Sequence, residues 1–266
     1  MATLSTRPLA VVTGGSSGIG LELARQFVSN GFDVVIAADR HVQGAQAELL
    51  SDGANVYAVE TDLATREGCD KLCEEVRALG RPVDALALNA GVGVGGEFLK
   101  TDLEAEINMV ELNCVSVLRL AKQLIPDMAA RGKGRVLITS SVAAVMPATY
   151  TAVYGATKAF DLGFAEALRE ELRETGVTVT ALQPGPTDTE FFERAGMQDT
   201  KIGTDDKDDP AQVAKQGFDA MMKGDDKVYA GSLKSRLQGL SGEVLPETVK
   251  AKQHAKLAQP GSGRKG

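Results

Sequence analysis

Short runs of apolar residues alternate along this chain with longer stretches in which apolar residues recur at helical spacing. The apolar runs predict strands at residues 9–13, 33–38, 55–61, 83–89, 135–140, 177–183 and 227–230. The amphipathic stretches predict helices at residues 21–30, 43–51, 66–79, 103–131, 153–175 and 210–223. Strands that are apolar on both faces and separated by helices indicate a parallel sheet covered on both sides. The pattern therefore predicts a single-domain α/β fold, a Rossmann-like doubly wound sheet of about seven mostly parallel strands with helices on both faces.

The chain shows no internal repeat and no linker that would divide it. The expected organisation is one domain over residues 1–250, followed by a C-terminal tail over residues 251–266 that is flexible at its end. Residues 199–209 are rich in Asp, Lys and Gly and are expected to form a mobile loop. Because ligands of doubly wound sheets bind at the carboxyl ends of the strands, site residues are expected in the loops at that edge.

Composition and charge narrow the class of protein. Of the 266 residues, 43% are hydrophobic and 24% are charged, which is enough apolar material for a sizeable core. The net charge of −7 and the lack of a long basic tract argue against a nucleic-acid partner. The longest apolar runs, such as residues 85–88, are too short to cross a bilayer, and the N-terminal segment lacks the apolar core of a signal peptide. We therefore expect no membrane association and a cytoplasmic location.

The three cysteines are Cys69, Cys73 and Cys114, and the two histidines are His41 and His254. Cys69 and Cys73 have helical spacing rather than the spacing of a metal-binding pair. These residues predict buried structural thiols, no metal site and a reducing compartment.

A glycine-rich segment, Thr13–Gly20 with the sequence TGGSSGIG, follows the first predicted strand and opens the first predicted helix. Glycines permit a tight turn and let backbone N–H groups approach a pyrophosphate, which the positive end of the helix also attracts. A plain glycine-rich turn would have the same composition, but the strand–turn–helix context favours nucleotide binding.

Asp39 lies just past the second predicted strand, where a carboxylate accepts hydrogen bonds from the adenosine ribose. The same carboxylate repels a 2′-phosphate, which favours NAD over NADP. Arg40 could instead pair with that phosphate, so an NADP-dependent protein is the alternative.

Tyr154 and Lys158 are four residues apart in a predicted helix, which places both side chains on one helix face. A phenol has an ordinary pKa near ~10 and is a poor acid or base at neutral pH. A neighbouring ammonium stabilises the phenolate, so we expect the pKa of Tyr154 to fall toward neutrality. Taken alone, the pair is also compatible with a simple exposed contact on a helix.

These motifs together resemble the short-chain dehydrogenase/reductase family over residues 8–240. The Thr13–Gly20 segment resembles its cofactor loop, and Tyr154 with Lys158 resembles its Tyr-x-x-x-Lys signature. Further matches occur in the order of the family, at Asp62, Asn89-Ala90-Gly91, Asn113, Ser141 and Pro184-Gly185 with Thr187 and Thr189. The resemblance implies an oxidoreductase that transfers a hydride between a nicotinamide cofactor and a carbonyl or secondary alcohol.

The resemblance also implies a role for each site residue. Tyr154 would exchange a proton with the substrate oxygen, and Ser141 would orient that oxygen. Lys158 would hold the nicotinamide ribose, and Asn113 would hold a water linked to Lys158. The implied cofactor contacts, besides Tyr154 and Lys158, are Gly14, Ser16, Ser17, Gly18, Ile19, Gly20, Asp39, Arg40, Asp62, Leu63, Asn89, Ala90, Gly91, Pro184, Gly185, Thr187 and Thr189.

The expected substrate contacts are mostly apolar or small, which favours a moderately hydrophobic substrate. They are Val92, Ala143, Met146, Thr149, Phe191 and Phe192. An alternative interpretation of Phe191 and Phe192 is that they pack a lid against the core.

The leading hypothesis is an NAD-dependent carbonyl reductase or alcohol dehydrogenase that acts on a small molecule. One alternative is an NADPH-dependent carbonyl reductase of the same family. An alternative of another class is a catalytically silent dinucleotide-binding protein that acts as a sensor or binds a partner. The resemblance further implies a homodimer or homotetramer that pairs through the helices at residues 103–131 and 153–175.

Overall fold

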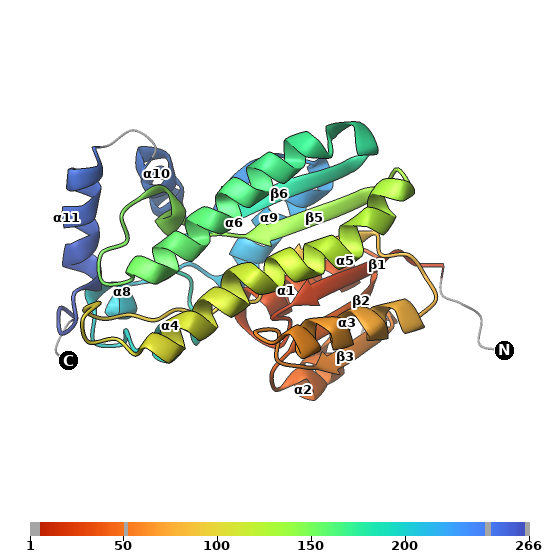
Figure 1. The fold of residues 1–266 in the computed structure, drawn as a ribbon, viewed down its shortest axis with the longest axis horizontal. Coiled ribbons are helices and arrows are strands. Elements are labelled where there is room, and N and C mark those ends of the chain that lie inside the picture. The colour runs from red at the N-terminus through yellow and green to blue at the C-terminus, as the bar shows by residue number, and fades with distance from the viewer. Residues whose placement is uncertain (1–5, 51–52, 243–245, 264–266) are drawn as a thin grey trace.

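The computed structural model describes residues 6–50, 53–242 and 246–263. Within these ranges the chain forms one seven-stranded sheet in the order β3-β2-β1-β4-β5-β6-β7 (Figure 1). The strands are β1 (Leu9–Thr13), β2 (Asp33–Ala38), β3 (Val56–Glu60), β4 (Ala85–Leu88), β5 (Gly134–Thr139), β6 (Val177–Pro184) and β7 (Lys227–Ala230). Every pairing between neighbouring strands is parallel. The doubly wound sheet predicted from the sequence is confirmed.

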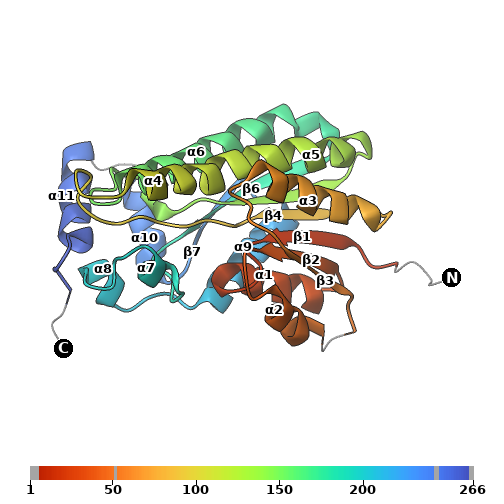
Figure 2. The same ribbon diagram turned by 60° about the horizontal axis from the view of Figure 1, so that its bottom comes forward.

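Helices cover both faces of the sheet, as Figure 2 shows. One layer consists of α3 (Arg66–Ala78), α5 (Ser116–Ala130) and α6 (Ala152–Glu171), and the other of α1 (Gly18–Ser29), α2 (Val42–Leu49) and α9 (Pro210–Lys223). Successive residues of a strand pack against opposite helix layers, because side chains alternate between the two faces of a sheet. In β1, Leu9 and Val11 pack toward the first layer, and Ala10 and Val12 pack toward the second.

The remaining helices lie near the end of the sheet where the candidate site is found. Helix α4 (Leu103–Val110) runs through a π-helical turn (Glu111–Val115) directly into α5. Helices α7 (Phe191–Arg194), α8 (Lys201–Thr204), α10 (Leu233–Gly242) and α11 (Glu247–Ala258) follow later in the chain. Figure 1 places α8, α10 and α11 together at this end of the molecule. Within the described ranges, no helix combines the length and the apolar character needed to cross a bilayer.

Most predicted elements match the structure closely, and the differences have local causes. The helix predicted over 103–131 is interrupted by the π-helical turn, and the helix predicted over 153–175 ends at Glu171 before a short 3₁₀ turn (Arg173–Thr175). The helix predicted over 43–51 ends at Leu49, and its predicted end at Ser51 lies outside the described residues. The loop predicted over 199–209 contains helix α8.

The C-terminal segment differs most from expectation. The division expected at residue 250 falls inside α11, so residues 251–258 belong to a helix rather than to a tail. Past this helix, the backbone N–H of Gly261 donates to Asp199 Oδ2 at 2.8 Å, and that of Gly263 donates to Asp199 O at 2.7 Å. Residues 264–266 lie outside the described ranges. Helix α11 is held by packing one face onto the body of the protein, which its weak amphipathic pattern did not indicate.

Candidate active site

A cavity of about 430 Å³ opens at the carboxyl ends of the strands. Its lining residues follow β1, β2, β3, β4, β5 and β6, and others come from α1, α6, α7, α8 and α11. Ligands of doubly wound sheets bind at this edge because the loops after the strands converge there. The geometry therefore brings the predicted cofactor loop and the predicted catalytic pair to one site.

The glycine-rich segment forms the turn between β1 and α1. Gly14 and Gly18 have positive φ angles of 66° and 53°, a conformation that side chains with a Cβ rarely adopt. A Cβ at Gly20 would lie 2.0 Å from Gly14 O, so a glycine is required there for the helix to approach the turn. The first residues of α1 line the cavity and turn the positive end of the helix dipole toward it. This cradle fits a pyrophosphate.

A second turn fixes the floor of the cavity beside this loop. The Thr13 Oγ1 atom accepts hydrogen bonds from the N–H groups of Asn89 at 2.9 Å and Ala90 at 3.0 Å. The Asn89 side chain then donates to Thr13 O at 3.2 Å and accepts from Thr139 Oγ1 at 3.1 Å. Asn89 therefore ties the ends of β1, β4 and β5 together and is more than a simple turn residue.

Asp39 and Arg40 line the cavity where it passes the end of β2. Arg40 Nε lies 3.6 Å from Asp39 Oδ2, and the two side chains keep 50% and 58% of their surface exposed. Both are therefore accessible to a ligand, and each partly neutralises the other. At such exposure the ion pair itself contributes little to stability.

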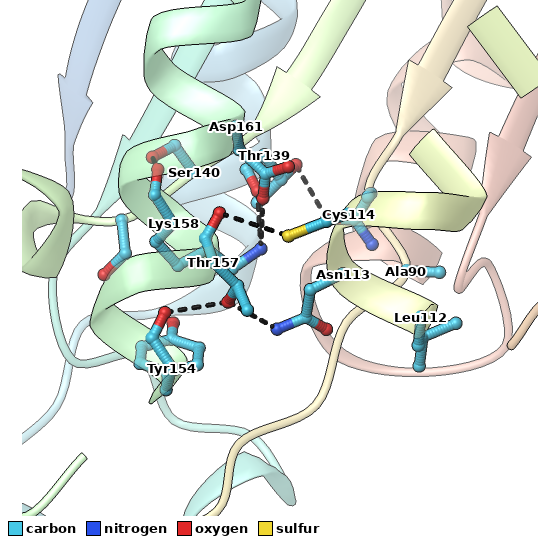
Figure 3. Close-up of polar contacts among 12 residues, drawn as sticks. Ala90, Leu112, Asn113, Cys114, Thr139, Ser140, Tyr154, Thr157, Lys158 and Asp161 are labelled. Atoms are coloured by element: carbon cyan, nitrogen blue, oxygen red, sulfur yellow. Dashed lines mark hydrogen bonds and ion pairs between the residues drawn. The ribbon is translucent and has the colours of Figure 1, made fainter. Parts of the chain in front are cut away.

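Tyr154 and Lys158 both belong to α6 and line the same cavity (Figure 3). Lys158 is 4% exposed. Its Nζ donates to Thr139 O at 2.8 Å and to Asp161 Oδ2 at 2.9 Å. The Asp161 carboxylate is also buried, and its Oδ1 has no hydrogen-bond partner. Burial is the largest single effect and favours the neutral amine, but Asp161, Tyr154 and Cys114 together outweigh it and raise the pKa of Lys158.

Tyr154 is half-buried, and its ring lies 5.2 Å from that of Phe191. Burial raises the pKa of Tyr154 above its ordinary value of 10.0, while Lys158 and a hydrogen bond with Ser141 lower it by less. The expectation that Lys158 brings this pKa down toward neutrality is therefore wrong. The Lys158 ammonium lowers the pKa of Tyr154, as predicted, but the loss of water around the phenol raises it by more. The Asp161 carboxylate also raises this pKa and so opposes the ammonium.

Asn113 lies in the π-helical turn between α4 and α5, and its side chain is fully buried. Its Nδ2 donates to Val92 O and to Thr157 Oγ1, both at 3.0 Å, and its Oδ1 accepts from Val92 N at 2.9 Å. Thr157 in turn donates to the carbonyl of Tyr154 at 2.8 Å. Asn113 does not line the cavity but joins the loop after β4 to α6. Its predicted role in holding a water stays a prediction.

The predicted cofactor contacts all line the cavity, as do five of the six predicted substrate contacts. The exception is Thr149, whose Oγ1 donates to Ala251 O at 3.1 Å. Thr149 therefore anchors α11, a helix that the sequence pattern had not indicated. Ser141 caps a short 3₁₀ turn (Val142–Val145) by accepting from Ala143 N at 3.1 Å.

The polar residues at the site that were not predicted from the sequence include Asp161 and His254. Asp161 lies three residues after Lys158, and this spacing on a predicted helix was the available signal. His254 lines the cavity from α11, in the segment that the sequence predicts to be a tail. Among the described residues, no group of three or more His, Cys, Asp or Glu is arranged to hold a metal ion.

The three cysteines are buried free thiols, as predicted. Burial raises the pKa of each to about 11, so they are protonated at neutral pH. Cys114 lies behind the site and donates to Thr157 O at 3.8 Å.

Comparison with known sequences identifies relatives of this arrangement. A model of the short chain dehydrogenase family matches residues 8–200. The NADP-dependent 3-hydroxy acid dehydrogenase YdfG of Salmonella typhi is 33% identical over 180 residues, which cover 66% of this chain and 71% of that protein. The 1-deoxy-11-beta-hydroxypentalenate dehydrogenase of Streptomyces exfoliatus is 36% identical over 216 residues, which cover 76% and 77% of the two chains.

Solved structures share the fold. A short-chain dehydrogenase from Sphingobium yanoikuyae in complex with NADPH matches with a TM-score of 0.78 and 27% identity, over 88% of this chain and 92% of that one. The L-sorbose reductase from Gluconobacter frateurii, complexed with NADPH and L-sorbose, matches with a TM-score of 0.74 and 29% identity, over 88% and 99%. The family model, the relatives and the shared fold agree with the geometry of the site, and this chain is an oxidoreductase that belongs to the short chain dehydrogenase family.

Proposed function

We propose that this chain reduces a carbonyl compound and that Tyr154 donates the proton to the carbonyl oxygen. The observation that carries the proposal is that Tyr154, Lys158, Ser141 and the glycine-rich turn all line one cavity. A nicotinamide cofactor held along this turn supplies the hydride. The same residues support alcohol oxidation in the reverse direction.

The protonation state of Tyr154 is the one that a proton donor requires. A phenol whose pKa lies above 10.0 carries its proton throughout the neutral range but is a weak acid, so its neighbours must stabilise the phenolate as the proton leaves. Ser141, which forms a hydrogen bond with Tyr154, is placed to hold the same substrate oxygen. The buried Lys158 ammonium stabilises the phenolate that remains after the proton has left.

The residues along the cavity fit a nicotinamide dinucleotide, and Asp39 and Arg40 are proposed to choose between its two forms. Asp39 supports NAD, since a carboxylate accepts hydrogen bonds from a free 2′-hydroxyl. Arg40 supports NADP, since a guanidinium binds a phosphate well. The relatives and solved structures include proteins named for NADP or bound to NADPH. NAD stays our prediction for this chain, with NADP as the alternative.

Exposed apolar residues support a homo-oligomer as the form of the protein. Phe98, Leu99, Leu103 and Ile107 keep 64%, 93%, 65% and 46% of their surface exposed, before and along α4. A patch of this kind is typical of an interface. We propose a homodimer or homotetramer in the cytoplasm, where three free thiols stay reduced. Sedimentation equilibrium distinguishes these assemblies from a monomer.

Replacing Tyr154 by Phe removes the proton donor but keeps the ring. We expect kcat for reduction of a panel of aliphatic and aromatic ketones to fall about 10²- to 10⁴-fold, because general acid catalysis contributes this much. Cofactor affinity, measured by fluorescence titration, should change little. Tyr57→Phe, which lies in β3, is the matched control and should keep full activity. Turnover retained in Tyr154→Phe would contradict the acid role, and absence of turnover in the wild type would favour a catalytically silent protein.

The raised pKa of Tyr154 can be measured directly in the protein without cofactor. Ultraviolet absorbance of the phenolate is followed against pH in the wild type and in Tyr154→Phe, and the difference isolates this residue among the four tyrosines. Because burial disfavours the charged form, the midpoint of the difference should lie above pH 10.0, the ordinary pKa. A difference titration whose midpoint lies below pH 10.0 would contradict the account.

Asp39→Asn and Arg40→Gln separate the two contributions to cofactor choice. We expect the wild type to bind NADH more tightly than NADPH. Asp39→Asn should weaken NADH binding by about tenfold, because a charged hydrogen bond is lost, and Arg40→Gln should weaken only NADPH binding. Fluorescence titration of the wild type and both variants with each cofactor measures the six affinities. Tighter NADPH binding by the wild type that disappears in Arg40→Gln would assign the choice to the arginine instead.

A further inference from the structure

Helix α11 contributes His254 to the lining of the cavity that contains Tyr154. Its buried residues recur every fourth position and make one face, which consists of Lys250, His254 and Ala258. This face packs on the loop between Ser141 and Tyr154, where His254 Nδ1 lies 2.9 Å from Thr149 O. The end of the chain therefore takes part in the candidate active site.

The contact with Thr149 fixes which nitrogen of His254 carries the proton. A carbonyl oxygen only accepts hydrogen bonds, so Nδ1 must be the donor in this contact. Burial lowers the pKa of His254, and the hydrogen bond to Thr149 offsets only part of this, so the ring is neutral at neutral pH. Nε2 is then an acceptor. Within the described part of the chain, Thr149 is the one hydrogen-bond partner of His254, so Nε2 is open to a ligand.

The surroundings of His254 decide what kind of ligand fits. The neighbouring cavity wall is largely apolar and includes Met146, Met197 and Ile202. Among the described residues, the arginine and lysine side chains that line the cavity are all ion-paired: Arg40 with Asp39, Lys158 with Asp161, and Arg194 with Glu190. A carboxylate beside His254 would be repelled by the Nε2 lone pair and would have to displace the present partner of any of these cations. An uncharged hydrogen-bond donor meets no such penalty.

We propose that His254 Nε2 accepts a hydrogen bond from a hydroxyl group of the substrate, at the end remote from the reacting carbonyl. The substrate class is then hydroxyketones with an apolar body, rather than plain alkyl ketones or keto acids. This inference rests on the proposed function, because Tyr154 defines the reacting end. His254 is a specificity-determining residue in this account and takes no part in proton transfer to the carbonyl.

The test compares ketones of equal chain length that end in a hydroxyl, a methyl ether or a carboxylate, over a series of chain lengths. We expect the wild type to prefer the hydroxyl member over its methyl ether by about tenfold in kcat/KM, as one added hydrogen bond gives. His254→Asn keeps an amide N–H near the Nδ1 position for Thr149 but has no acceptor at the Nε2 position. The preference should fall to about one in this variant.

Two further variants separate the acceptor from the structural role of α11. His254→Gln extends an amide toward the Nε2 position and should keep part of the preference. Gln253→Asn alters an exposed position of the same helix and should keep all of it. Circular dichroism verifies that each protein is folded. A preference that is equal in the wild type and His254→Asn, or a wild type that favours the ether or the carboxylate, would overturn the inference.

A binding measurement keeps this test separate from that of the proposed function. Calorimetric titration of the Tyr154→Phe protein, loaded with cofactor, compares the hydroxyketone with its methyl ether without turnover. Tighter binding of the hydroxyketone, lost when His254→Asn is added, supports the inference even if no ketone is reduced by the wild type. Absence of ketone reduction by the wild type would contradict the proposed function but not the role of His254. Equal binding of both ligands would overturn the role of His254.

Discussion

The candidate site depends on keeping the Lys158 ammonium charged inside the protein. An unpaired ammonium at this depth would lose several kcal/mol of hydration free energy, so the fold must supply acceptors. Thr139 at the end of β5 and Asp161 on α6 supply them, at 2.8 and 2.9 Å. The same contacts fix α6 over the edge of the sheet and so place Tyr154 in the cavity. Asn113 and Thr157 connect α6 to the loop after β4, which also lines the cavity.

The fold could be predicted from the sequence because its signals are local and strong. Strands buried on both faces read as continuous apolar runs, and β1, β2, β7 and helix α9 have the predicted bounds. The π-helical turn and α11 could not be predicted in this way. The turn is an interruption within a continuous amphipathic pattern, and α11 is stabilised by tertiary contacts such as the one between His254 and Thr149.

The candidate site could be predicted as far as its residues carry characteristic spacings. The glycine-rich turn, Tyr154, Lys158 and Ser141 line one cavity, as expected. The pKa of Tyr154 was predicted wrongly, because the sequence shows a neighbouring charge but not the loss of water around the phenol. Asp161 reverses part of the effect of Lys158 on the pKa of Tyr154. The signature formed by Tyr154 and Lys158 therefore omits a third residue on which the electrostatics of the site depend.

The central claim, that Asp161 keeps Lys158 charged and buried, is tested most directly by a double-mutant cycle. The free energy of unfolding is measured in denaturant for the wild type, Asp161→Leu, Lys158→Met and the double variant. Breaking a buried pair at one partner costs about 3–5 kcal/mol, whereas replacing both partners by apolar residues costs far less. The account predicts that Asp161→Leu is strongly destabilised and that the double variant recovers most of the loss. Losses that simply add would contradict it.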